Sequence, residues 1–299
     1  MNPLQSHEFS ARIQRNEPMS RHTSWRVGGP ADYFYEPRDR AELGAFLREL
    51  PQETSVYWVG LGSNLLVRDG GLRGVVISMQ GVFTRLEQRG PTSVYCECSV
   101  PCTRLARQAT QWNMAEGEFF AGIPGTLGGA LAMNAGAYGG ETWKHVVSVE
   151  VIDRSGVCRV RSAAEYQPGY RHVQRPANDE WFLAAELQFG VQSDGDRERV
   201  RQLSARRKAT QPLGEWSCGS VFTNPPGDHA ARLIEAAGLK GYRIGDAVVS
   251  TKHANFIINE RSASAAQLEQ LILHVQATVE QVHGVKLIPE VRIVGEALQ

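Results

Sequence analysis

The 299-residue sequence has no excess of either charge, because 32 Lys and Arg residues balance 32 Asp and Glu residues. A balanced charge points to neither a nucleic acid nor an anionic membrane surface as the partner. No apolar run reaches the roughly 18 residues that a membrane-spanning helix needs. Residues 1–20 also lack the apolar segment of a secretion signal. These absences predict a cytoplasmic protein without nucleic acid or membrane insertion.

Cysteine is scarce as well, with five residues, three of them in the segment CECSVPC at 96–102. A metal or iron–sulfur site would need a fourth ligand at a matching spacing, and Cys158 and Cys218 are isolated. The alternation of TSVYCECSV (92–100) is typical of a strand. We therefore expect buried, reduced thiols and no metal site.

Hydrophobic periodicity predicts a chain that mixes helices and strands. The expected helices are 41–50, 102–113, 197–210, 229–238 and 264–284, and the expected strands are 56–60, 74–79, 92–100, 146–153, 157–162, 181–190, 255–259 and 285–295. A hairpin turn is expected at 154–156. The composition turns polar at 191–196, which predicts a longer N-terminal region followed by a C-terminal domain of about 100 residues.

The segment 264–284 is the strongest helix prediction in the chain. Ser264 and Gln267 have the spacing of a capping box, and Gly284 is placed to end the helix. One apolar stripe is expected to face the core: Leu268, Leu271, Ile272, Val275, Val279 and Val282.

Glycine gathers in two segments, 59–71 and 121–140, and the second contains seven glycines but no Lys, His or Asp. A glycine costs roughly 0.5–1 kcal/mol inside a helix or strand, so the cluster needs a reason. Glycine turns can direct backbone N–H groups at phosphate oxygens. Neither segment has the lysine of a phosphate-binding P-loop, GLGSNL lacks the third glycine of a Rossmann fingerprint, and no G-x-S-x-G is present. The pattern favours a dinucleotide held non-covalently by its pyrophosphate.

Four polar side chains stand out in the second half of the chain. Ser220 lies between small residues in SCGSVFTNP, Arg171 lies in PGYRH, and Glu290 and Arg292 in IPEVR are expected on one face of a strand. Each has an ordinary alternative: a helix cap for the serine, a surface ion pair for Arg171, an exposed pair for the last two. The basic cluster 206–208 is equally typical of a solvated helix face. Since no base accompanies Ser220 at a known spacing, its hydroxyl is better suited to donate a proton than to attack.

Eight segments occur in an order that is similar to one enzyme family: HTSWRVGGPADYF, GLGSNLLV, AGIPGTLGGALAMNAGAYGGE, GYR, CGSVFTNP, LIEAAGLKG, VVSTKHANFIIN and LIPEVRIVG. Over about residues 20–295 the chain resembles the UDP-N-acetylenolpyruvoylglucosamine reductases. The resemblance implies the α+β fold class, with a vanillyl-alcohol-oxidase-type FAD-binding fold and a C-terminal α+β substrate domain. The implied domains are 1–78 and 79–195 for FAD and 196–299 for substrate, with the C-terminal tail returning to the first.

The resemblance implies a non-covalent FAD, which agrees with the lack of histidine in both glycine segments. The implied FAD contacts are Gly60, Leu61, Gly62, Ser63, Asn64, Leu65, Gly122, Ile123, Pro124, Gly125, Thr126, Gly128, Gly129, Asn134, Ala137 and Tyr138. The implied substrate contacts are Tyr170, Lys208, Asn224 and Arg292, while the block containing Lys252, His253 and Asn255 receives no definite role.

The implied reaction is the NADPH-dependent reduction of UDP-N-acetylglucosamine enolpyruvate to UDP-N-acetylmuramate for peptidoglycan, and thereby for cell shape and division. Hydride would come from flavin N5 and the proton from Ser220. Arg171 and Glu290 would stabilise negative charge at the substrate carboxylate. Because an ionised Glu290 would repel that carboxylate, we predict that it is protonated or bridged by Arg171 or Arg292, with its pKa raised by burial and the like charge.

The chain departs from the usual family pattern at four positions: His22, Met133, Val173 and Thr223. The short interval between Arg171 and Ser220 resembles the family's shorter form, which lacks a tyrosine-bearing loop. Two rivals stay open at this point. One is another FAD oxidoreductase, such as an alcohol oxidase, and the other is a non-catalytic sugar-nucleotide-binding protein.

Overall fold

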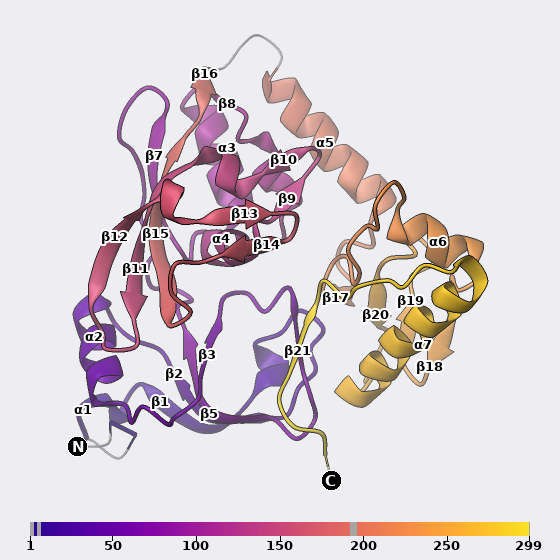
Figure 1. Ribbon diagram of the computed structural model, residues 1–299, viewed down its shortest axis with the longest axis horizontal. Helices are drawn as coiled ribbons and strands as arrows, with labels where there is room; N and C mark the ends of the chain where they lie inside the picture. The colour runs from indigo at the N-terminus through magenta and orange to yellow at the C-terminus, as the bar shows by residue number, and fades with distance from the viewer. Residues whose placement is uncertain (1–2, 5–6, 192–195, 299) are drawn as a thin grey trace. The chain divides into compact units, whose positions relative to one another are not determined.

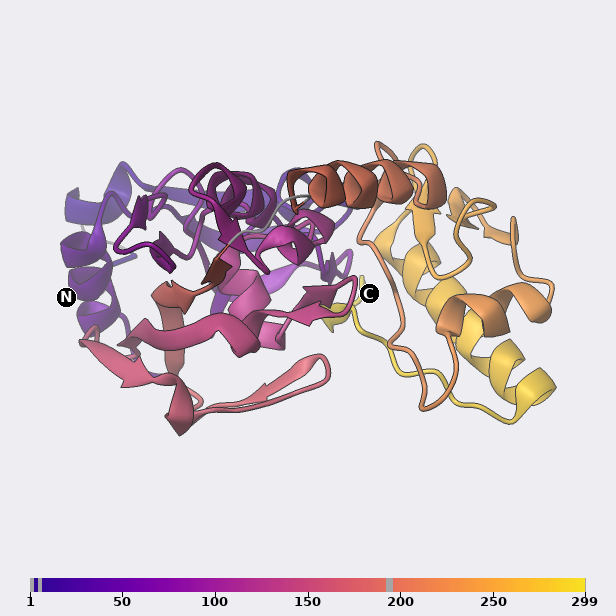
Figure 2. The same cartoon turned by 90° about the horizontal axis from the view of Figure 1, so that it is seen from above.

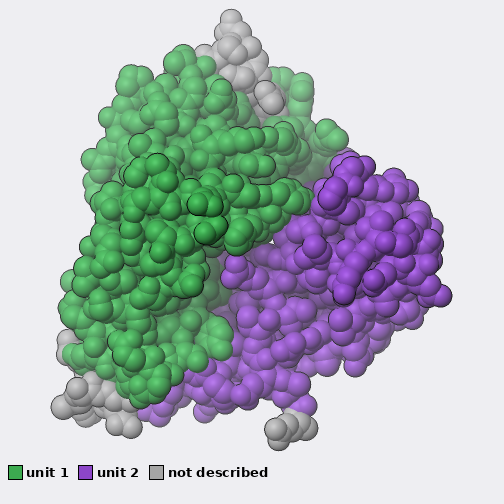
Figure 3. Space-filling view, in the orientation of Figure 1, with its two compact units in different colours: residues 1–14, 35–60, 77–207 green, residues 15–34, 61–76, 208–299 purple. Residues whose placement is uncertain are grey.

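The computed structural model describes residues 3–4, 7–191 and 196–298. The chain forms two compact units that each combine segments far apart in the sequence (Figure 3). The first unit is Met1–Gln14, Tyr35–Gly60 and Ile77–Arg207, and the second is Arg15–Phe34, Leu61–Val76 and Lys208–Gln299. The expected domain boundaries at 78/79 and 195/196 stay a prediction.

Helices and sheets are mixed along the described chain (Figure 1), as the predicted α+β class requires. The helices are α1 (His7–Ser10), α2 (Arg40–Glu49), α3 (Cys102–Gln111), α4 (Leu127–Met133), α5 (Asp196–Thr210), α6 (Ala230–Ala236) and α7 (Ala265–His283).

Three larger sheets organise the strands. The first has the order β1-β2-β5-β3 (Ile13–Pro18, Pro30–Tyr35, Leu72–Ser78, Val56–Val59). The second has the order β12-β11-β15-β7-β6 (Cys158–Ser162, Val146–Asp153, Glu180–Gln188, Ser93–Glu97, Leu86–Gln88). The third has the order β17-β20-β19-β18 (Trp216–Ser217, Ile257–Asn259, Ala247–Val249, Arg243–Ile244). Four strand pairs complete the described structure: β9 (Gly136–Ala137) with β10 (Gly140–Glu141), β8 (Met114–Ala115) with β16 (Gly190–Val191), β13 (Gln167–Gly169) with β14 (His172–Gln174), and β4 (Leu65–Val67) with β21 (Arg292–Val294).

The hairpin of β11 and β12 forms at the predicted turn. Asp153 Oδ1 accepts hydrogen bonds from the N–H groups of Ser155 and Val157, at 2.9 and 3.0 Å. Gly156 adopts a φ of 73°, which glycine reaches without a Cβ penalty. These turn contacts are consistent with the register of the two strands, in which Ile152 pairs with Cys158.

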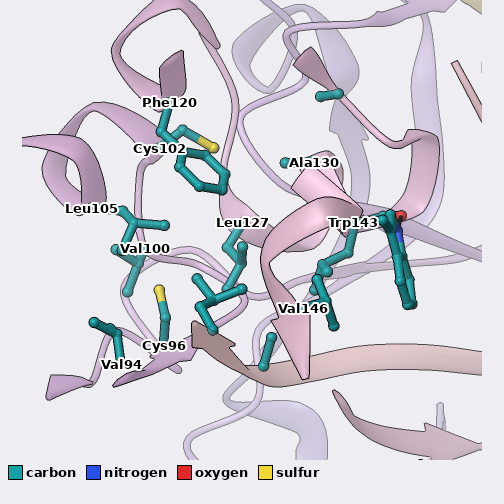
Figure 4. Close-up of a cluster of buried hydrophobic side chains, with 14 of the residues drawn as sticks. Val94, Cys96, Val100, Cys102, Leu105, Phe120, Leu127, Ala130, Trp143 and Val146 are labelled. Carbon is teal, nitrogen blue, oxygen red and sulfur yellow. Dashed lines mark hydrogen bonds between the residues drawn. The ribbon is translucent and has the colours of Figure 1, made fainter. Parts of the chain in front are cut away.

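The core of the first unit lies between its five-stranded sheet and helices α3 and α4 (Figure 4). Cys96, Cys98 and Cys102 are buried and free, as predicted, and burial raises the pKa of the Cys98 thiol to about 12. Within the described residues no group of His, Cys, Asp and Glu could hold a metal ion. Cys158 is exposed, unlike the other four cysteines.

The core of the second unit is built on α7, which both views show along the short strands β18 to β20 (Figures 1 and 2). The capping box is confirmed: Ser264 Oγ accepts from Gln267 N–H at 3.1 Å, and Gln267 Oε1 accepts from Ser264 N–H at 3.2 Å. Gly284 ends the helix with a φ of 67°. The expected stripe is buried except for Val282, which is 55% exposed, so its assignment to the core is wrong.

The C-terminal strand is shorter than predicted. Only Arg292–Val294 of the expected 285–295 forms a strand, and it pairs in parallel with β4. Residues 288–290 pair instead with the Ser220 segment, where the Ile288 carbonyl accepts from Thr223 N–H at 2.9 Å and Glu290 N–H donates to the Val221 carbonyl at 2.7 Å. Glu290 therefore precedes the strand, and the expectation that it shares a strand face with Arg292 is wrong. Among the described helices, none is both long and apolar enough to cross a membrane.

Candidate active site

Ser220 lies in a segment of the second unit that runs antiparallel to the segment carrying Glu290. The carbonyl of Val221 accepts hydrogen bonds from the N–H groups of Glu290, at 2.7 Å, and Val291, at 3.4 Å. One step further, Phe222 and Pro289 form an isolated antiparallel bridge. The backbone thus places two predicted catalytic residues, 70 positions apart in the sequence, on neighbouring segments.

Asn64 of the first glycine segment is tied to the same place. Its Nδ2 donates to the carbonyl of Glu290 at 3.0 Å, and its own carbonyl accepts from the N–H of Arg292 at 3.1 Å. The pairing of β4 with β21 continues directly from this contact. Residues predicted for cofactor, catalysis and substrate therefore meet in the second unit.

Arg171 belongs to the first unit, at the tip of the β13–β14 hairpin. Gly169 pairs with His172, so Tyr170 and Arg171 form the two-residue turn, and Arg171 has a φ of 55°. Its Nη2 donates to the carbonyl of Gly136 at 2.9 Å. The arginine is thus fixed against the predicted cofactor residues 134–138.

Asn134 supports that hairpin from the end of α4, where it has a left-handed φ of 46°. Its Nδ2 donates to the carbonyl of Gly169 at 2.9 Å, and its Oδ1 accepts from Trp143 N–H at 3.1 Å. The side chain is buried and engaged with protein groups. The resemblance implies a cofactor contact for Asn134, and no sequence signal indicates its contact with the Arg171 hairpin.

Gly60 and the second glycine segment make close contacts within the first unit. A Cβ added to Gly60 would lie 2.9 Å from Thr126 Oγ1, and one added to Gly122 would lie 2.5 Å from the Cβ of Ala137. These approaches require glycine, because real Cβ contacts are not so short. Gly60 therefore packs on the Thr126 side chain, and Gly122 packs on the side chains of Ala137 and Tyr138.

Gly62 and Gly129 show that glycine serves two different purposes here. In the second unit, a Cβ on Gly62 would lie 2.0 Å from the carbonyl oxygen of His22, so packing within the chain explains this glycine. In the first unit, Gly129 is exposed on α4, and its nearest neighbour would be Thr126 Oγ1 at 4.0 Å. A helical glycine costs about 1 kcal/mol relative to alanine. The open main chain at Gly129 fits a bound group that approaches the backbone closely.

One basic residue near these segments was missed. Arg207 was expected on a solvated face with 206 and 208, but it is half-buried, and its Nη1 donates to the carbonyl of Ala121 at 3.0 Å. Burial lowers the pKa of Arg207 and raises the pKa of Tyr138, whose hydroxyl donates to Leu203 at 3.2 Å. Nothing in the charged sequence of α5 distinguishes this arginine from its neighbours.

The expected substrate residues are mostly accessible. Tyr170 is 55% exposed, and Lys208, Asn224 and Arg292 are exposed as well. Asn224 Oδ1 also accepts from the N–H of Ala230 at the start of α6, at 3.1 Å. Lys208 is joined to a neighbouring loop by its carbonyl, which accepts from Lys252 Nζ at 2.6 Å. The catalytic, cofactor and substrate roles all stay predictions.

The four departures from the family pattern are accommodated locally. Val173 is buried in the core of the first unit, and Met133 packs against that core. Thr223 Oγ1 donates to the carbonyl of Ile288 at 3.3 Å. The His22 ring stacks on Phe34 with centroids 4.0 Å apart, and its Nε2 lies 3.0 Å from Glu17. Each of these side chains has a protein environment that suits it.

Known proteins match both parts of the chain. Residues 31–161 match the family model described as FAD binding domain, and residues 211–294 match that of the UDP-N-acetylenolpyruvoylglucosamine reductase C-terminal domain. The chain is 58% identical over 285 residues to the UDP-N-acetylenolpyruvoylglucosamine reductase of Alkalilimnicola ehrlichii, covering 94% of each protein. It is 55% identical to that of Methylococcus capsulatus, covering 94% of this chain and 93% of the relative. It is similar to the crystal structure of UDP-N-acetylenolpyruvylglucosamine reductase from Thermus caldophilus, with a TM-score of 0.81 and 31% identity, over 94% of this chain and 98% of that one.

Proposed function

The chain belongs to the UDP-N-acetylenolpyruvoylglucosamine reductase family, and we propose that it reduces UDP-N-acetylglucosamine enolpyruvate to UDP-N-acetylmuramate with NADPH. The predicted family, the α+β FAD-binding fold and the assignment as an FAD-dependent oxidoreductase are confirmed. The observation that carries the finer proposal is the 2.7 Å hydrogen bond between Glu290 N–H and the Val221 carbonyl, which sets Glu290 beside the Ser220 segment. NADPH as reductant and the cytoplasmic location stay predictions.

FAD would be held by main-chain amides of Gly60–Leu65 and Gly122–Gly129, with Asn134–Tyr138 continuing along it. Gly129 supports this assignment, since its backbone is open where a side chain would otherwise stand. When bound, FAD supplies hydride transfer from NADPH to the enolpyruvyl group. The chain's own residues would position the substrate, stabilise the developing negative charge and deliver the proton.

We assign Arg171 and Glu290 to the substrate carboxylate, where negative charge develops as the double bond is reduced. Donors fixed in advance stabilise such charge most, and removing one typically costs about 10²–10³ in kcat. The bond from Arg171 to Gly136, at 2.9 Å, supports a fixed guanidinium. Glu290 is held through its main chain by Val221 and by Asn64.

We assign Ser220 as the donor of the proton that the reduced substrate takes up. A serine hydroxyl is a weak acid, but the carbanionic carbon next to a carboxylate is a strong base, so transfer is favourable when the geometry is right. Tyr170, Lys208, Asn224 and Arg292 would bind the UDP-sugar, with Lys208 on its diphosphate. Their exposure in the structure leaves them accessible to such a ligand.

The test separates the two half-reactions by rapid mixing. In Ser220→Ala, reduction by NADPH should stay near the wild-type rate, while reoxidation by the enolpyruvyl sugar nucleotide should slow by at least about 100-fold. Ser262→Ala, an exposed serine of the same unit bonded to Asp246, is the matched control and should change neither rate. Equal losses in both half-reactions of Ser220→Ala would overturn the proton-donor assignment.

A further inference from the structure

Asn255 holds the residue pair that follows Ser220. Its Oδ1 accepts from Phe222 N–H at 3.0 Å, and its Nδ2 donates to the Phe222 carbonyl at 2.8 Å. Its own carbonyl accepts from Val221 N–H at 2.9 Å. Asn255 is 4% exposed, so these bonds form away from water. One asparagine therefore satisfies three of the four backbone polar groups of Val221 and Phe222.

The fourth group, the Val221 carbonyl, accepts from Glu290 N–H at 2.7 Å. The peptide after Ser220 is thus fixed on one side by Asn255 and on the other by Glu290. Any shift of Val221 and Phe222 would move Ser220 relative to Glu290. Asn255 therefore influences the position of Ser220 relative to Glu290 without contacting a reacting atom.

Ser220 needs this support because strand β17 ends at Ser217, three residues before the serine. Ser217 is paired with Ile258, whereas Val221 bonds to Asn255. Between these two contacts residues 218–220 belong to no strand, and Asn255 lies in the turn before β20. Gly219 has a φ of 81° within this stretch. Because Ser220 lies outside the ladder, its position depends on the hydrogen bonds that hold Val221 and Phe222 directly after it.

We propose that Asn255 is the positioning residue of the proton donor: it fixes the hydroxyl of Ser220 against Glu290 for protonation of the reduced substrate. The inference rests on the proposed function, in which Ser220 supplies that proton. Asn255 itself contacts neither substrate nor cofactor in this account. Its effect is expected only in the half-reaction that uses the serine.

Asn259 provides a matched control within the same unit. It is also a buried asparagine, 3% exposed, whose Nδ2 donates to the Trp25 carbonyl and whose Oδ1 accepts from Ala263 N–H, both at 2.9 Å. Both side chains bridge two backbone groups, but the partners of Asn259 lie outside the Ser220 segment. Loss of stability alone should therefore be similar in the two variants.

The experiment measures single-turnover reoxidation of the NADPH-reduced holoenzyme by the enolpyruvyl sugar nucleotide. In Asn255→Ala we expect reoxidation to slow by about 10- to 100-fold, since a misplacement of about 1 Å can cost 10²-fold. Reduction by NADPH should change less than about twofold. Asn259→Ala should leave both rates near wild type. Asn255→Asp, which keeps the acceptor for Phe222 N–H but loses the amide donor, should be slowed as well and carries the test if the alanine variant does not fold.

A double variant separates positioning from general damage. With Ser220 already replaced by alanine, Asn255→Ala should slow reoxidation no further, because the group that it positions is gone. A wild-type reoxidation rate in the folded Asn255 variants, or an undiminished effect in the Ser220→Ala background, would overturn the inference. If Ser220→Ala itself reoxidised at the wild-type rate, the proposed proton donor would fail instead, so the two failures are distinguishable.

Discussion

Replacing Gly129 by alanine should strengthen the folded chain and weaken its cofactor binding. Helix α4 buries Leu127 and Ala130 in the core of the first unit (Figure 4). Gly129 is exposed on the same helix. Apart from its chain neighbours and the backbone of its own helix, a Cβ at this position would find no heavy atom nearer than 4.0 Å. The protein itself therefore gives no reason for glycine.

The changes expected in folding stability and in FAD affinity have opposite signs. Without FAD, the alanine variant should be more stable by roughly 0.5–1 kcal/mol, the cost of a helical glycine. With FAD, the added methyl group would occupy space assigned to the cofactor. Overpacking of this kind typically costs about 1–3 kcal/mol, which corresponds to a dissociation constant raised roughly 5- to 150-fold.

Stability would be measured by urea denaturation of the FAD-free protein, and affinity by titration of FAD fluorescence. Ala132→Gly is the reverse control, since Ala132 is exposed on the same helix. It should lower stability by about 1 kcal/mol and leave affinity unchanged. A Gly129→Ala variant that binds FAD as tightly as wild type would refute the claim that this open backbone is there for the cofactor.

Three further predictions concern other parts of the chain. Gly62→Ala should lower the free energy of unfolding by about 2–4 kcal/mol, because it adds a clash with the His22 carbonyl to the strain of a positive φ. Gly238→Ala has a positive φ but open space, so its free energy of unfolding should fall by no more than about 1–2 kcal/mol in the same denaturation assay. Equal losses of stability in the two variants would refute the clash. Glu290→Gln should keep most activity in pH-rate profiles, whereas Glu290→Ala should not, because the role assigned to this residue is a hydrogen bond to the substrate carboxylate. Complete inactivity of the Gln variant would show that the negative charge of Glu290 is required. Burial lowers the pKa of His253 from its ordinary 6.5, so as the pH falls this residue is protonated in the unfolded chain before it is protonated in the folded one. The urea midpoint should therefore drop as the pH falls below about 6.5, and the drop should be smaller in His253→Gln. An equal drop in His253→Gln would exclude His253 as its cause.

Local chemistry explains which elements could be predicted from the sequence. The capping box of Ser264 and Gln267, the glycine end of α7 and the turn at 154–156 depend on neighbouring residues, and all three are confirmed. The C-terminal strand depends on a partner more than 220 residues earlier, and only the part after Pro289 meets β4. Val282 continues the apolar period of α7 at its last turn, where the core no longer covers the helix.

In the predicted site, too, residue types could be read from the sequence, but contacts between distant segments could not. Glycine-rich composition and the residue types at 171, 220 and 290 select the segments of the predicted site, but not the contacts that hold these segments. Asn255 reaches Phe222 across 33 positions, and Arg207 reaches Ala121 across 86. Neither contact leaves a periodic or compositional signal, because both depend on how distant segments pack.

The central claim is that this chain holds FAD and passes its reducing equivalents to an enolpyruvyl sugar nucleotide. The most direct test is to reduce the purified yellow protein with NADPH under anaerobic conditions and then add UDP-N-acetylglucosamine enolpyruvate. The visible flavin absorbance should return in one turnover, with one equivalent of UDP-N-acetylmuramate formed per bound FAD. A protein that binds no FAD, or whose reduced flavin is unaffected by this substrate, would contradict the account.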